Sequence, residues 1–151
     1  MIPLMNFLTA IFAFMGCFGF CFIFHLRGVS CILASLGGAM GWLVFLCLGF
    51  LQNDILQSFL ATVAVAVYTE ILARIAKKPA TCYLIIGVLP LVPGGGIYYT
   101  MYYFLSEDIE RFLCTGLQTL GVAGALAAGV LIIISVSRLI MTLKKRARPC
   151  L

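Results

Sequence analysis

The chain is poor in charge. Only 10% of its 151 residues are charged, five are acidic, and it holds a single histidine. A soluble domain carries about 25% charged residues, so a soluble enzyme, a disordered chain and a nucleic-acid-binding module are excluded. The seven cysteines include no CxxC pair and mostly lie in apolar runs, which indicates small buried hydrophobes rather than a disulfide framework.

Apolar sequence is what the chain has in abundance. Hydrophobic residues make up 64% of it, and the mean hydropathy is +1.17. A spanning helix needs about 20 apolar residues, so the length allows about five spans. We therefore predict an all-α integral membrane protein, with residues 1–151 forming a single transmembrane domain. The expected spans are 2–24, 31–51, 55–76, 81–105 and 112–143.

Charge is distributed unevenly over these spans. Nine of the ten basic residues fall on one side of five crossings: Arg27, Arg74, Lys77, Lys78, Arg138, Lys144, Lys145, Arg146 and Arg148. The other side holds Arg111 and four of the five acids, Asp54, Glu107, Asp108 and Glu110. The positive-inside rule then places the N-terminus outside and the C-terminus in the cytoplasm. We expect a multi-pass protein of the cytoplasmic membrane whose basic tail contacts anionic lipid and not nucleic acid.

The fourth expected span is interrupted near its middle by Pro90, Pro93 and the glycines 94–96. A proline inside a helix removes one backbone hydrogen bond, which would free the carbonyls of Ile86 and Leu89. Each glycine costs about 1 kcal/mol relative to alanine. Unsatisfied backbone at membrane depth is tolerated only inside protein or beside a cavity. We predict a broken helix that binds substrate; the alternative is a kink that only shapes the bundle.

The two ends of a broken helix predict its ligand. Free amides at Gly94, Gly95 and Gly96 favour a carboxylate, and free carbonyls at the end of the first half favour an ammonium group or another cation. An amino acid or a small dicarboxylate suits such ends, and Tyr98 is the tyrosine nearest to them. The predicted substrate-binding residues are Pro90, Pro93, Gly94, Gly95, Gly96 and Tyr98.

Glu70 and Arg74 form a second candidate, because positions i and i+4 share a helix face. Ionisable residues within a span usually mark a pathway or a proton relay, so both are candidate proton or charge relays. The alternative is a local ion pair, with Arg74 reaching the interface. Cys17, Cys21 and His25 also share a face but lack a fourth ligand, so we expect no metal and no cofactor.

Small residues recur at helical spacing at Gly37 and Gly41, and again at Gly121, Ala125 and Gly129. Such stripes let helix backbones approach closely in lipid. They predict a tight bundle without saying whether the neighbour belongs to the same chain. A non-transporting membrane scaffold is therefore the alternative function.

Three segments together resemble the threonine/serine exporter (ThrE-type) family. They are Glu70-x-x-Ala73-Arg74, Lys78-Pro79-Ala80-Thr81 and the run PLVPGGGIY from Pro90 to Tyr98. The length resembles the family's separate small subunit, the YjjB-like proteins. The resemblance implies secondary transport, which is export of threonine and serine, or of succinate in the split branch, together with a larger YjjP-like partner subunit.

The predicted function is thus a subunit of a secondary exporter for a small carboxylate-bearing metabolite, not an enzyme. The chain has no ATP-binding motif, so its driving force would be an ion gradient. A five-span unit that starts outside also fits after a five-span partner that starts in the cytoplasm. Two such halves have opposite orientations, as in inverted-repeat transporters.

Overall fold

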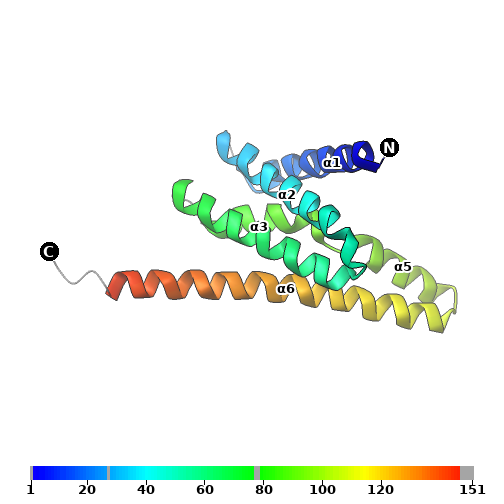
Figure 1. Ribbon diagram of the computed structural model, residues 1–151. Coiled ribbons are helices and arrows are strands. Elements are labelled where there is room, and N and C mark those ends of the chain that lie inside the picture. Colours follow the sequence, from blue (N-terminus) through cyan, green and yellow to red (C-terminus); the bar gives the residue numbers. More distant parts are fainter. Residues whose placement is uncertain (1, 27, 77–78, 147–151) are drawn as a thin grey trace.

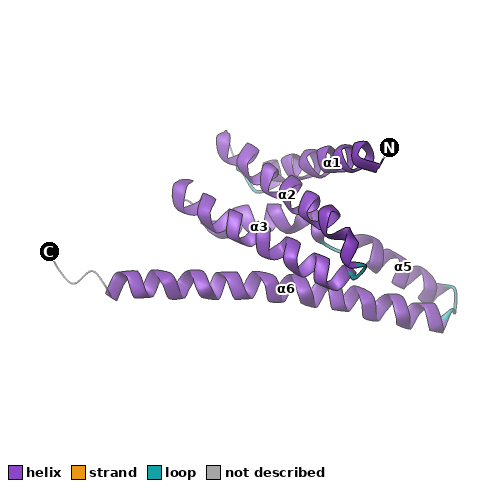
Figure 2. Cartoon of the chain, in the orientation of Figure 1, coloured by secondary structure: helices purple, strands orange, loops and turns teal. Residues whose placement is uncertain are grey.

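The structure is a computed structural model that describes residues 2–26, 28–76 and 79–146, with side chains for residues 8–26, 28–76 and 79–143. Its helices are α1 (Ile2–Ile23), α2 (Val29–Cys47), α3 (Asp54–Ala76), α4 (Ala80–Val88), α5 (Gly94–Leu105) and α6 (Ile109–Arg146), with 3-10 turns η1 (Leu48–Leu51) and η2 (Leu89–Leu91). The described residues form helices and connecting turns only, as the composition predicts (Figure 2).

The helices form a bundle with α6 along one edge (Figure 1). In this bundle α1 packs on α2, α2 on α3, and α3 on α6, while α4 contacts both α2 and α3. α5 pairs with the first part of α6, and this hairpin extends past the turn that joins α2 to α3 (Figure 1). The α3–α6 seam therefore runs from the hairpin toward the C-terminal end of the chain.

Within the described residues, three helical segments are long and apolar enough to cross a membrane: Val29–Leu51, Asp54–Ala76 and Ile109–Leu143. The bent pair α4–η2 and α5 makes a fourth if it is counted as one span. α1 has 22 residues, but its part with described side chains, Leu8–Ile23, is shorter than the other segments. The chain is thus an all-helical membrane protein with three or four candidate spans, and a fifth crossing stays a prediction.

Much of the predicted orientation depends on residues outside the described part of the chain. These are Arg27, Lys77, Lys78 and Arg148, together with the side chains of Lys144, Lys145 and Arg146. Of the basic residues with described side chains, Arg74 lies in the last turn of α3 and Arg138 near the C-terminal end of α6. Both lie far along the bundle from the α5–α6 hairpin, which carries Arg111.

The small-residue stripes pack helices of the same chain together. A Cβ added at Gly41 would collide with Val65 of α3, and one added at Gly37 would come within 3.0 Å of Tyr68. On α6, a Cβ added at Gly129 would lie 3.2 Å from Thr62 of α3. These glycines are therefore used inside the bundle, where they let α2 and α6 approach α3.

Candidate functional site

The helix breaks between α4 and α5, where the sequence predicts it. α4 ends at Val88, η2 continues to Leu91, and α5 begins at Gly94. Val92 is extended, with φ −62° and ψ 129°, and the two arms are bent by 52°. The expected span 81–105 is thus divided into two helices, α4 and α5, at the segment from Pro90 to Gly94.

The two carbonyls released by the prolines are paired in the structure. The Cys17 thiol on α1 donates to the Ile86 carbonyl, with its Sγ 3.3 Å from the oxygen. The Val92 N–H donates to the Leu89 carbonyl at 3.3 Å. Each of these carbonyls thus already accepts one hydrogen bond, from α1 or from the turn, and keeps one lone pair; the expected attraction for a cation stays a prediction.

The start of α5 is open by contrast. Its N-cap is Pro93, and no side chain caps the first turn. The Gly94 N–H bonds back into the turn at 2.7 Å, while the amides of Gly95 and Gly96 have no partner within a helix at this position. A Cβ at Gly94 or Gly95 would meet nothing within 4 Å, whereas Gly96 lies against Thr119 of α6. A ligand has access to this backbone at Gly94 and Gly95.

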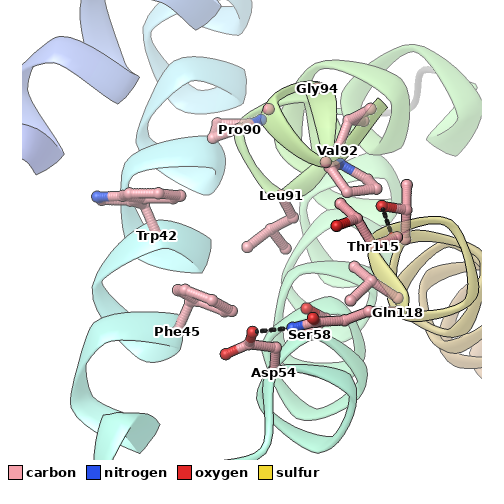
Figure 3. Close-up of a pocket in the computed structure, with 15 residues that line it drawn as sticks. Trp42, Phe45, Asp54, Ser58, Pro90, Leu91, Val92, Gly94, Thr115 and Gln118 are labelled. Carbon is pink, nitrogen blue, oxygen red and sulfur yellow. Dashed lines mark hydrogen bonds between the residues drawn. The ribbon is translucent and has the colours of Figure 1, made fainter. Parts of the chain in front are cut away.

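A cavity of about 360 Å³ lies at the break, and we call it the break cavity (Figure 3). The predicted site residues that line it are Pro90, Pro93, Gly94, Gly95 and Gly96. The end of α2 adds an apolar wall, Trp42 and Phe45. The facing helices α3 and α6 add the polar residues Asp54, Ser58, Thr115, Gln118 and Thr119. The break cavity is thus bounded by proline and glycine backbone on one side and polar side chains on the other.

Asp54 is the charged residue of this cavity that sequence reasoning missed. It fell between the expected spans 31–51 and 55–76, but it is the first residue of α3. Asn53 holds that helix start, because its Oδ1 accepts the N–H groups of Ile55 at 3.1 Å and Leu56 at 3.3 Å. The Gln118 amide of α6 donates to Asp54 Oδ2 at 2.7 Å, as Figure 3 shows. A carboxylate therefore lines the same cavity as the open start of α5.

The cavity lies beside the first turn of α3 and not beside the middle of that helix, since Asp54 and Ser58 are its α3 residues. The polar positions Thr115, Gln118 and Thr119 share one face of α6 at helical spacing. Three polar residues on one face of an otherwise apolar span could have predicted that this face of α6 lines a cavity, but the sequence analysis did not use them.

Tyr98 lies outside the cavity. It is on the first turns of α5, its side chain is 66% exposed, and the cavity lining does not include it. Its ring packs edge-on against Tyr99, with centroids 5.4 Å apart. In this conformation Tyr98 belongs to the exposed aromatic surface of the α5–α6 hairpin.

Glu70 and Arg74 lie on one face of α3, as their spacing predicts, but they meet through a third residue. The Ser137 hydroxyl of α6 donates to Glu70 Oε2 at 2.6 Å. Arg74 Nη2 donates to the Ser137 Oγ at 3.0 Å and lies 3.7 Å from Glu70 Oε2. Ser137 is 5% exposed, and sequence reasoning missed it because nothing local marks which span faces Glu70.

The Glu70 network is separate from the break cavity. Glu70 lies on α3 about 24 Å from Asp54, at 1.5 Å per helical residue. The structure therefore does not bring the two predicted groups of site residues together. It places one at each end of the α3–α6 seam.

The cysteines of α1 serve the packing. Besides the Cys17 contact, Cys21 donates to the Cys31 carbonyl at 3.4 Å, and both Cys17 and Cys21 are fully buried. His25 is exposed beyond the end of α1. Within the described residues, no group of three or more histidine, cysteine or acidic side chains is arranged to hold a metal ion.

Comparison with known proteins gives one family. The family model described as "Threonine/Serine exporter, ThrE" matches residues 9–136, which is most of the chain. The chain matches no curated protein and no solved structure. The matched range includes the break, the Asp54–Gln118 pair and Glu70, and it ends one residue before Ser137.

Proposed function

Since the chain belongs to the threonine/serine exporter family, a family of membrane transporters and not of enzymes, we propose that it is a subunit of a secondary transporter that exports a small amino acid. The observation that carries this proposal is the break cavity, where the open amides at the start of α5 and the Asp54 carboxylate line the same space. The two groups have opposite polarity, which suits a zwitterion.

The substrate carboxylate would bind at the first turn of α5, where the N–H groups of Gly95 and Gly96 have no helical partner and the positive end of the helix dipole adds its attraction; the Gly94 N–H already donates to the Val92 carbonyl at 2.7 Å. The ammonium group would bind Asp54. A hydroxyl on the substrate side chain would meet Ser58 or Thr115, which line the same cavity. Prolines 90 and 93 contribute by keeping the backbone open rather than by contact chemistry.

Asp54 favours an amino acid over the alternative substrate, a succinate-like dicarboxylate. A second carboxylate in the cavity would lie near an ionised Asp54, and like charges repel. The described lining brings no lysine or arginine that would offset this repulsion. Threonine or serine is therefore the substrate class that we propose.

Glu70 is the proposed relay for the proton that drives export, with Arg74 balancing its charge. Glu70 is the acid of α3 that lies far from the hairpin end, and its side chain is 16% exposed. Ionisable groups in such positions of membrane proteins are usually functional.

The proposed topology has five crossings, with the N-terminus outside and the C-terminus in the cytoplasm, in the cytoplasmic membrane. We propose that the chain forms one transmembrane domain and works with a larger YjjP-like subunit of opposite orientation. The structure offers no specific support for a non-transporting scaffold, because the glycines at 37, 41 and 129 pack against the chain's own α3.

Transport by vesicles that contain the chain and its larger partner tests the proposal. Gly95→Leu should abolish efflux of radiolabelled L-threonine, because the new side chain would stand over the free amides, where an added Cβ meets nothing within 4 Å. Gly124→Leu is the matched control, since Gly124 on α6 also has nothing within 4 Å and lines none of the described cavities. Wild-type vesicles without any L-threonine flux, or equal flux in the two variants, would refute the proposed site.

Glu70→Gln tests the relay separately. It should stop net efflux of L-threonine driven by a proton gradient. Unchanged proton-driven efflux in this variant would show that Glu70 is a structural ion pair.

A further inference from the structure

A second cavity lies toward the other end of the α3–α6 seam, and we call it the Glu70 cavity. Its volume is about 210 Å³, and α3, α4 and α6 all line it. At about 30 Å³ per water molecule, this is the space of several waters or of one small amino acid. None of its lining residues also lines the break cavity.

Glu70 brings to this cavity a carboxylate with unused acceptor capacity. A carboxylate accepts about four hydrogen bonds, and the described side chains supply one, from Ser137 at 2.6 Å. Arg74 directs its Nη2 hydrogen bond to Ser137 and lies 3.7 Å from the carboxylate oxygen. The remaining lone pairs of a largely buried carboxylate are thus available to a donor such as an ammonium group.

Arg138 brings the opposite charge. Arg138, an exposed residue of α6, is part of the lining of the same cavity, and among the described side chains no acid forms an ion pair with it. A guanidinium binds a carboxylate through two parallel hydrogen bonds. Thr69 and Thr81 are further polar residues of this lining, although the Thr69 hydroxyl donates to the Ala66 carbonyl at 3.0 Å.

We propose that the Glu70 cavity is a second subsite for the same zwitterionic substrate, loaded from the C-terminal end of the bundle, with the ammonium group on Glu70 and the carboxylate on Arg138. The inference rests on the proposed function, which supplies the substrate class. The Glu70 cavity then offers the substrate a carboxylate and a guanidinium, as the break cavity offers the Asp54 carboxylate and the amides of α5. In both cavities the α3 carboxylate also accepts a hydrogen bond from α6, at 2.7 Å from Gln118 and at 2.6 Å from Ser137.

This subsite also explains how one carboxylate serves substrate and proton. In the proposed relay, a proton and the substrate ammonium group compete for the same Glu70 carboxylate, so binding of one displaces the other. The charged groups of the described residues around it are Arg74 on its own helix and Arg138 from α6, while α4 contributes the uncharged Thr81.

The test is the concentration of L-threonine that gives half-maximal transport, measured separately from each face of the membrane. Vesicles of both orientations would contain the full chain with its larger partner, and the probe is radiolabelled L-threonine. Arg138→Gln should raise the value at the cytoplasmic face by about tenfold or more, which is the loss of one charge-assisted contact. The value at the outer face should stay unchanged, and Arg138→Lys should restore part of the cytoplasmic affinity.

Arg111→Gln is the matched control, because Arg111 is an exposed arginine of the same helix, paired with Asp108 at 3.3 Å and outside both cavities. An unchanged cytoplasmic value in Arg138→Gln, or an equal rise at both faces, would overturn the subsite. An effect that disappears when anionic lipid is left out of the vesicles would assign the cavity to a phospholipid headgroup and overturn it too. Wild-type vesicles without flux at either face would instead refute the proposed function.

Discussion

Replacing Asp54 by asparagine should separate the charge of the break cavity from its shape. Asparagine keeps a side-chain oxygen for the Gln118 amide, which lies 2.7 Å from the carboxylate, so we expect the fold to be retained. What is lost is the charge that would hold the ammonium group of the substrate. A hydrogen bond to a charged group contributes about 2 kcal/mol, and each 1.4 kcal/mol is a factor of ten. The affinity for L-threonine should therefore fall about 30-fold.

Counterflow in vesicles loaded with unlabelled L-threonine measures this affinity through competition with a radiolabelled pool. The same assay with succinate as competitor gives the opposite expectation, because removing a negative charge from the cavity favours a dicarboxylate. Asp108→Asn is the control, since Asp108 also begins a helix, accepting the Arg111 N–H at 3.2 Å, and lies outside the cavity. An unchanged affinity for L-threonine, or a fall as large in the control, would refute the role of Asp54.

Two further predictions concern stability, measured by unfolding in detergent. Cys17→Ala should lower the free energy of unfolding by about 1–3 kcal/mol, because the Ile86 carbonyl loses the thiol that donates to it at 3.3 Å and stays buried without a donor. Cys47 is exposed, so Cys47→Ala should have little effect on stability. Equal losses of stability in the two variants would contradict this explanation. Tyr83→Phe should leave stability unchanged or raise it by about 1 kcal/mol, because the buried Tyr83 hydroxyl has no hydrogen-bond partner among the described residues. A clear loss in Tyr83→Phe, with none in the exposed Tyr99→Phe, would mean that the hydroxyl bonds in another conformation.

The position of the break relative to the neighbouring helices changes how the site is understood. Sequence reasoning placed it at the middle of the fourth apolar stretch, and α4 and α5 confirm that position within the stretch. In three dimensions the break faces Asp54 and Ser58, which begin α3, because the α5–α6 hairpin extends past the other helices. The break in the middle of the stretch 81–105 therefore lies beside the start of α3 and not beside its middle.

The partners of the helix ends show where sequence reasoning reached its limit. It correctly identified Ile86 and Leu89 as the carbonyls that two prolines would release. It had no means of assigning Cys17 as the donor to Ile86, since the two residues are 69 positions apart. Both carbonyls accept a hydrogen bond within the fold, and the ammonium partner that we propose is Asp54.

Local chemistry in the sequence determined that this chain is helical, apolar enough for a membrane and broken at Pro90 to Gly96, because backbone hydrogen bonding and helix propensity depend on neighbouring residues. The tertiary structure alone decided which side chains face the break and which face Glu70. The deciding contacts, Asp54 with Gln118 and Glu70 with Ser137, join residues 64 and 67 positions apart. No local pattern encodes such pairs, since they follow from how closely α6 packs against α3.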